Sequence, residues 1–140
     1  MKLADWGALG QAGALLQGQL AELGAAESAT HVTLNPDSGR IRILIATDLG
    51  LLDYGFQPPA GGPDSASMLR GQLHRWASVR GLRVQTDAQL EADGSQTRWL
   101  WHLVVDEPRI ELVADSEGSA ERAPAAVLPF IRACLELGGQ

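Results

Sequence analysis

The sequence predicts an α+β fold in two layers: one twisted, mainly antiparallel sheet with helices on one face, in the order α-βββ-α-βββ-α. Short segments alternate polar and apolar residues, as strands do, and segments with apolar residues at helical spacing separate them. Neighbouring strands are close enough in sequence to form hairpins, which favours antiparallel pairing. With 140 residues, the chain fits a single α+β domain, residues 1–140.

The first helix is predicted over residues 3–24. Four leucines at helical spacing form its apolar stripe: Leu9, Leu16, Leu20 and Leu23. A hairpin is expected next, because two alternating segments, 31–34 and 40–45, flank a turn cluster at 35–39. A third strand is expected over 51–57, and the proline- and glycine-rich segment 58–63 predicts a loop.

The second half begins with a helix predicted over 64–80, capped by Asp64 or Ser65 and ended by Gly81. Strands are expected at 82–86, 96–105 and 109–114, with a break at Glu107–Pro108. A final helix is predicted over 123–137. Pro129 lies inside it and is expected to kink or restart it, because proline lacks the donor that a helix interior needs.

Alternation assigns the strand residues to two faces. The core face, which the helices cover, is expected to carry Val32, Leu34, Ile41, Ile43, Ile45, Leu82, Val84, Trp99, Trp101, Leu103, Val105, Ile110 and Leu112. The outer face is expected to carry His31, Thr33, Arg40, Arg42, Leu44, Arg83, Gln85, Arg98, Leu100, His102, Val104, Arg109, Glu111 and Val113. On this assignment, five arginines share the outer face with one carboxylate, that of Glu111.

Arginines alternating with aliphatic side chains are typical of protein interfaces. The candidate partner-binding residues are Leu44, Leu100, Val104, Val113, Arg40, Arg42, Arg83, Arg98 and Arg109. The expected partner is another protein. A homodimer is also expected, with its contact through the second helix or the outer face. Two alternatives stay open: a solvated face on which arginine hinders aggregation, and an anion- or nucleic-acid-binding face. If the face binds protein, Leu100→Asp is expected to abolish binding and leave the fold intact.

Composition bounds the remaining possibilities. The formal net charge is −6, and no aromatic residue is expected on the outer face, so nucleic acid is a disfavoured partner. No apolar segment approaches the roughly 18 residues of a transmembrane helix, and Asp5 interrupts the start before a signal sequence could form. We therefore expect a cytoplasmic chain with no membrane partner.

No group of residues in the sequence matches a known arrangement of catalytic residues. The single cysteine, Cys134, is expected to be a buried apolar residue, and three histidines at unrelated positions are a weak metal signal. The aspartates fall in or beside predicted turns and caps. Trp99 and Trp101 are expected in the core. The sequence therefore predicts a protein without enzymatic activity, cofactor or metal.

The element order, size and acidity resemble the type III secretion chaperones. The matching stretches are the hairpin around 35–39, the strand 51–57, the helix 64–80 entering a strand through Gly81, and the C-terminal end 117–137, which is acidic at first and then helical. The resemblance implies a dimeric domain that holds an unfolded segment of an effector protein and catalyses nothing. Small phage-encoded proteins and toxin-immunity proteins, which bind and inhibit a protein target, are the alternative class.

Overall fold

The computed structural model describes residues 2–6, 9, 11–35, 37–57, 69–90, 92–94, 96–115 and 124–138. Its elements are a 3-10 helix η1 (Leu3–Asp5), helix α1 (Gln11–Leu23), strands β1 (Glu27–Leu34), β2 (Ile41–Thr47), β3 (Leu51–Phe56) and β4 (Leu69–His74), a 3-10 helix η3 (Trp76–Ser78), strands β5 (Arg83–Leu90), β6 (Gln96–Val105) and β7 (Ile110–Asp115), and helix α2 (Pro124–Gly138). The fold is α+β, as predicted.

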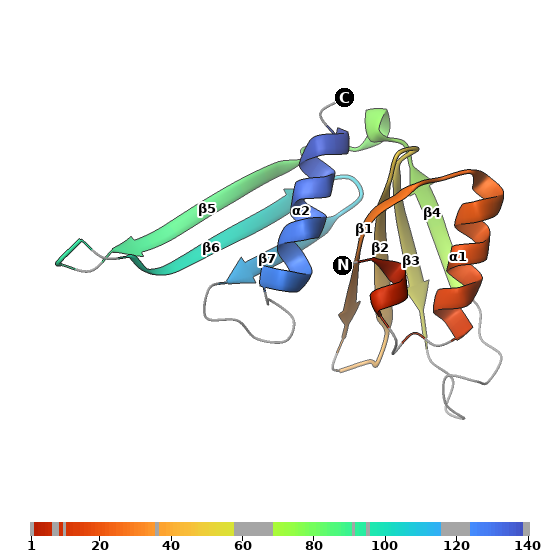
Figure 1. Ribbon diagram of the computed structural model, residues 1–140, viewed down its shortest axis with the longest axis horizontal. Coiled ribbons are helices and arrows are strands. Elements are labelled where there is room, and N and C mark those ends of the chain that lie inside the picture. The colour runs from red at the N-terminus through yellow and green to blue at the C-terminus, as the bar shows by residue number, and fades with distance from the viewer. Residues whose placement is uncertain are drawn as a thin grey trace.

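The strands form two antiparallel sheets, so the predicted single sheet is wrong. One sheet has the order β1-β2-β3-β4 and the other β5-β6-β7. Each predicted strand triplet pairs as expected, with Leu44 opposite His31 and Leu103 opposite Leu112. Figure 1 shows α2 between the two sheets and α1 on the far side of the four-stranded sheet. The helices therefore do not share one face, because each side of the four-stranded sheet is covered by a different one.

Helix α2 joins the two sheets through one core. Its Val127, Phe130, Ile131 and Cys134 pack with side chains from both sheets. The four-stranded sheet contributes Ala29, Leu44, Ala46 and Leu51, and the three-stranded sheet contributes Leu103, Val105, Ile110, Leu112 and Ala114. Phe130 is fully buried at the centre of this cluster. The helix runs unbroken through Pro129, so the expected restart does not occur.

The opposite side of the four-stranded sheet packs against α1 and η1. Its Ile43, Ile45 and Leu52 form a second core with Leu3, Leu9, Leu16 and Leu20. Three of the four predicted stripe leucines are buried, but Leu23 at the end of α1 is 48% exposed. The predicted helix 3–24 is shorter and begins with a separate 3-10 turn, since residues 3–5 and 11–23 form different elements.

The predicted second helix is wrong in its described part. Residues 69–74 form strand β4 and 76–78 form η3, while 64–68 and the loop 58–63 lie outside the described residues. Leu69 and Leu73 suit helical spacing, but they also lie on one side of a strand, opposite Phe56 and Leu52. Gly71 between them disfavours a helix. Pairing with β3 therefore decides this segment, because it satisfies the backbone and buries both leucines partly.

The remaining strands agree with the sequence. β6 has the predicted bounds, β7 is displaced by one residue, and Glu107–Pro108, a cis peptide bond, separates the two. β5 is longer than expected, because it continues to Leu90, which pairs with Gln96 at the start of β6. β7 pairs only with residues 100–105 of β6. The outer part of β5–β6 is therefore a two-stranded ribbon that projects from the body (Figure 1).

Candidate functional site

Two of the predicted anchors are not on the surface. Leu44 is 1% exposed because α2 covers that side of the four-stranded sheet, so its assignment to an outer face is wrong. Val104 is 5% exposed. It lies directly between Arg83 and Glu111 on the neighbouring strands, and long side chains at such positions cover an aliphatic residue. Neither residue is available to a partner.

Leu100 and Val113 are half-buried on the side of the three-stranded sheet that faces away from α2. Leu100 lies in the middle of β6, directly opposite Asp87 on β5 and Asp115 on β7. A carboxylate at position 100 would therefore lie in a row with two others. The repulsion expected in Leu100→Asp would destabilise the sheet whichever face the residue occupied, so that substitution cannot test binding alone.

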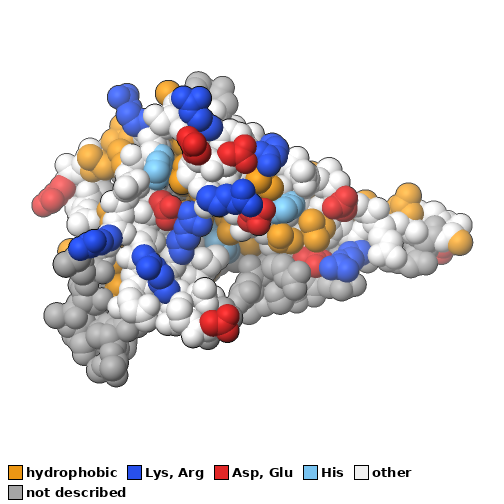
Figure 2. All heavy atoms as spheres, turned by 180° about the vertical axis from the view of Figure 1, so that it is seen from behind, with side chains coloured by type: hydrophobic (Ala, Val, Ile, Leu, Met, Phe, Trp, Pro, Cys, Tyr) orange, Lys and Arg blue, Asp and Glu red, His pale blue; other side chains and the backbone are white. Residues whose placement is uncertain are grey.

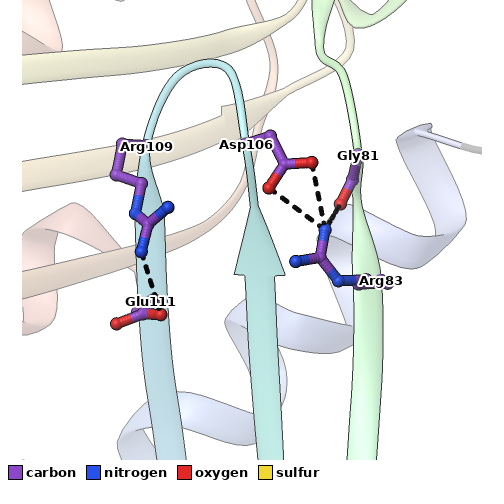
Figure 3. Close-up of polar contacts among 5 residues, drawn as sticks. All are labelled: Gly81, Arg83, Asp106, Arg109 and Glu111. Carbon is purple, nitrogen blue, oxygen red and sulfur yellow. Dashed lines mark hydrogen bonds and ion pairs between the residues drawn. The ribbon is translucent and has the colours of Figure 1, made fainter.

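The arginines predicted for the outer face are mostly ion-paired across strands. Arg83 donates through Nη1 to both carboxylate oxygens of Asp106, each at 3.2 Å, and to the carbonyl of Gly81 at 2.8 Å. Arg109 pairs with Glu111 at 3.4 Å. Figure 3 shows both pairs at the end of the three-stranded sheet where β6 turns into β7.

Two further pairs are bidentate and less exposed. Arg42 donates through Nε to Asp53 at 2.9 Å and through Nη2 at 2.7 Å. Arg98 contacts Asp115 through the same two atoms, at 3.3 and 2.6 Å. The Asp115 side chain is only 5% exposed. Bidentate geometry of this kind is the strong form of the arginine–carboxylate contact.

Three carboxylates on this surface were missed because each was expected in a turn. Asp53, Asp106 and Asp115 are far from their arginines in sequence and approach them only when the strands pair. Figure 2 accordingly shows basic and acidic side chains interspersed over the rear face of the molecule. The paired carboxylates neutralise much of the positive charge that the sequence predicted there.

Arg40, the fifth arginine, lies in an open groove of about 1060 Å³ on the four-stranded sheet. Its guanidinium lies against Gly55 of β3, where a Cβ atom would come within 2.6 Å of Nη2. Arg42, His74 and Glu111 also line this groove. The groove is polar and wide open, and it contains both signs of charge.

The β5–β6 ribbon is the surface feature that the sequence did not reveal. Trp101, predicted in the core, is 38% exposed, and Leu90 near the tip is 66% exposed. Trp99 is half-buried against the core below α2. Trp99 and Trp101 lie on one side of the ribbon and Leu100 on the other, so both sides carry apolar surface. Alternation alone could not show this, because it does not reveal how far a sheet extends beyond its covering helix.

The other reactive residues do not come together. His31 is buried against the rings of Trp6 and Phe130, at centroid distances of 5.9 and 6.3 Å, so its predicted place on an outer face is wrong. His74 lies on β4 instead of a helix. In the described part of the chain, no three His, Cys, Asp or Glu residues lie close enough to hold a metal ion.

Cys134 is buried in the α2 core, as predicted. Burial raises the pKa of its thiol to about 12. At neutral pH the thiol is therefore protonated and shielded, which is the opposite of what a nucleophile needs.

Comparison with protein-family models, with curated proteins and with solved structures found no match to this chain. None of the helices in the described ranges is long and apolar enough to cross a membrane.

Proposed function

We propose that this chain is a non-enzymatic protein-binding domain and that the β5–β6 ribbon is its partner-binding part. The observation that carries the proposal is the apolar surface of this ribbon. Trp101 and Leu100 lie on opposite sides at its base, where β7 ends, and Leu90 is exposed in the part that projects beyond β7. A two-stranded ribbon is only marginally stable in water by itself. Tryptophan is enriched among the anchors of protein interfaces, and Trp101 is 38% exposed on this ribbon.

The ion pairs support a binding role over catalysis. The carboxylates of Asp53, Asp106, Asp115 and Glu111 each accept from an arginine on the same or a neighbouring strand. In each pair the guanidinium occupies a carboxylate oxygen that a general acid or base would need for its substrate. The same pairs leave less unbalanced positive charge for an anionic polymer.

Within the protein-binding class, the resemblance to secretion chaperones favours an effector segment as the partner, and the alternative is a toxin or another inhibited protein target. Of the stretches that carry this resemblance, the β1–β2 hairpin, β3 and α2 are present in the structure. The described part of the predicted second helix forms β4 and η3 instead. An extended segment could lie against the apolar sides of the ribbon, or add a strand to its open edge. A homodimer is part of the proposal, but its contact is not placed on the predicted second helix, because the described part of that segment forms β4 and η3.

The test compares threonine variants in pull-downs from the native host: Leu100→Thr with Trp101→Thr on the ribbon, and Leu34→Thr as the control on β1. Leu100→Thr removes an anchor from the ribbon and keeps a residue that favours strands. Leu34→Thr makes the same change on β1, where the leucine is 53% exposed and distant in sequence from the ribbon. We expect Leu100→Thr, combined with Trp101→Thr, to lose the partner that the native chain and Leu34→Thr retain.

Salt separates the two classes of partner. Capture that survives high salt and depends on Leu100 and Trp101 supports an apolar protein interface. Recovery of nucleic acid that falls steeply with salt and ignores both substitutions would overturn the proposal.

A further inference from the structure

The outer edge of β5 is an open strand edge. Among the described residues, β5 pairs only with β6. All of its residues are exposed except Val84, which is half-buried. An edge of this kind presents a row of unpaired N–H and C=O groups, which is a template for another strand.

Among the described residues, this edge has little of the usual protection against pairing. Charged side chains, above all lysine, together with proline and bulges are the common devices. β5 contains neither lysine nor proline, and its two charged residues, Arg83 and Asp87, are of opposite sign. Its one register shift, between Gln89 and Leu90, is at the tip. The β1 edge of the other sheet differs, because Trp6 donates from its indole to the Thr30 carbonyl of β1 at 3.2 Å. A segment from the N-terminus thus occupies part of that edge.

The charges of β5 are complementary to those of a second β5. Arg83 and Asp87 lie on the same side of the strand, with Gln85 midway between them. If two copies pair antiparallel about a two-fold axis at Gln85, Arg83 of each copy lies directly opposite Asp87 of the other. Val84 then lies opposite Thr86. A pairing centred on Asp87 would instead place two aspartates opposite each other, which is destabilising.

Both charged groups have capacity for this contact. The side chain of Asp87 makes no ion pair or hydrogen bond with the described residues. Arg83 uses only Nη1 for Asp106 and Gly81, so Nε and Nη2 can donate to a further carboxylate. An arginine between Asp106 and the incoming Asp87 would extend the pair in Figure 3 into a network of three groups.

We propose that a second copy of this chain pairs with β5 through its own β5, in the register centred on Gln85. The two three-stranded sheets then become one continuous antiparallel sheet. This inference rests on the proposed binding role of the ribbon. It assigns the edge to the second copy and leaves the apolar sides, with Trp101 and Leu100, to a different protein.

The experiment measures molar mass by light scattering across a dilution series. We expect the native chain to approach twice its 14.9 kDa monomer mass at high concentration. Asp87→Arg puts two arginines opposite each other at both ends of the pairing, and we expect the dimer dissociation constant to rise roughly tenfold to hundredfold. Asp37→Arg, which makes the same charge change in the exposed β1–β2 turn, is expected to dimerise normally.

Mixing two variants tests the register. Arg83→Asp is also expected to be monomeric alone, but an equal mixture with Asp87→Arg restores opposite charges at both positions and should restore the dimer. If Arg83→Asp fails to fold beside Asp106, as circular dichroism would show, the Asp87→Arg and Asp37→Arg comparison decides alone. A monomeric native chain, or a dimer that Asp87→Arg leaves unchanged, would overturn the inference.

The outcome is separable from the proposed function. If the Asp87→Arg variant is monomeric but still captures the partner of the native chain, both proposals are supported. The β5 edge and the apolar sides of the ribbon then act independently. Loss of capture in Leu100→Thr with Trp101→Thr, with dimerisation retained, supports the same division. If a segment of a different protein pairs with the β5 edge, Asp87→Arg will reduce capture of that protein and leave the molar mass unchanged. That result would overturn the assignment of the edge to a second copy.

Discussion

At the scale of single residues, the arginine–carboxylate pairs differ mainly in burial. The Asp115 side chain is 5% exposed, whereas Arg109 and Glu111 are both more than half exposed. Removing an ion-pair partner of a buried carboxylate weakens the compensation for its lost hydration. Removing the partner of an exposed carboxylate costs little, because water replaces the contact.

This contrast predicts unequal effects of two matched substitutions. Arg98→Ala is expected to lower the free energy of unfolding by about 1–3 kcal/mol. Arg109→Ala is expected to lower it by less than about 1 kcal/mol. Urea titrations followed by circular dichroism measure both. Equal effects would mean that the Arg98–Asp115 pair is no better shielded than the exposed one.

Gly81 carries two separate constraints. Its φ of 72° lies in the left-handed region, and a Cβ atom there would meet the carboxylate of Asp106. Gly24 has a similar φ of 74° and nothing within 4 Å of the Cβ position. Gly24→Ala is expected to cost about 1 kcal/mol for backbone strain, and Gly81→Ala distinctly more. Denaturation midpoints measure the difference, which reports the disruption of the Arg83–Asp106 pair.

Cys134 links burial to pH. Because burial raises the pKa of its thiol to about 12, the folded protein binds this proton more tightly than the unfolded chain does. The resulting stabilisation is fully present below about pH 9 and is lost as the pH rises toward 12. At pH 8 we expect no reaction with Ellman's reagent in the native state and one thiol per chain after unfolding in guanidinium. Rapid labelling of the native chain would contradict the buried position.

At the scale of elements, Leu100 in the middle of β6 lies between aspartates on the two neighbouring strands. Leu100 separates Asp87 from Asp115, so a new carboxylate there repels both, while an amide of the same shape does not. Leu100→Asp is therefore expected to be about 1 kcal/mol less stable than Leu100→Asn at pH 7. The difference should shrink at high salt, which screens the repulsion between the carboxylates. Thermal unfolding of both variants at low and high salt measures it. A difference in stability that does not depend on salt would contradict repulsion among these three positions.

At the scale of the whole molecule, the four-stranded sheet belongs to both cores. Phe130 of α2 lies in one core and Leu16 of α1 in the other, and both are buried. Phe130→Ala is expected to cost about 3–5 kcal/mol and Leu16→Ala about 2–5 kcal/mol. Because the sheet connects the cores, each variant should shift one common transition, seen alike by circular dichroism and tryptophan fluorescence. Two separate transitions would show that the cores unfold independently.

Most individual elements follow from local pattern. Both strand triplets, their antiparallel pairing, the bounds of β6 and the C-terminal helix were predicted correctly, because alternation, turn residues and a long apolar helical pattern are local signals. Segment 69–74 was not, since Leu69 and Leu73 fit a helix and a strand equally well. The backbone of β3 provided the pairing partner that made the strand more stable.

The sequence by itself determined the α+β class, the strand triplets and the burial of Cys134, because these depend on periodicity and composition within short segments. Only the tertiary structure decided that there are two sheets and that α2 lies between them, because the choice depends on which apolar sides meet. That choice moved Leu44 into the core, exposed Trp101 and brought Asp53, Asp106 and Asp115 to their arginines. Residues far apart in sequence decide such contacts, and alternation along one strand contains no information about them.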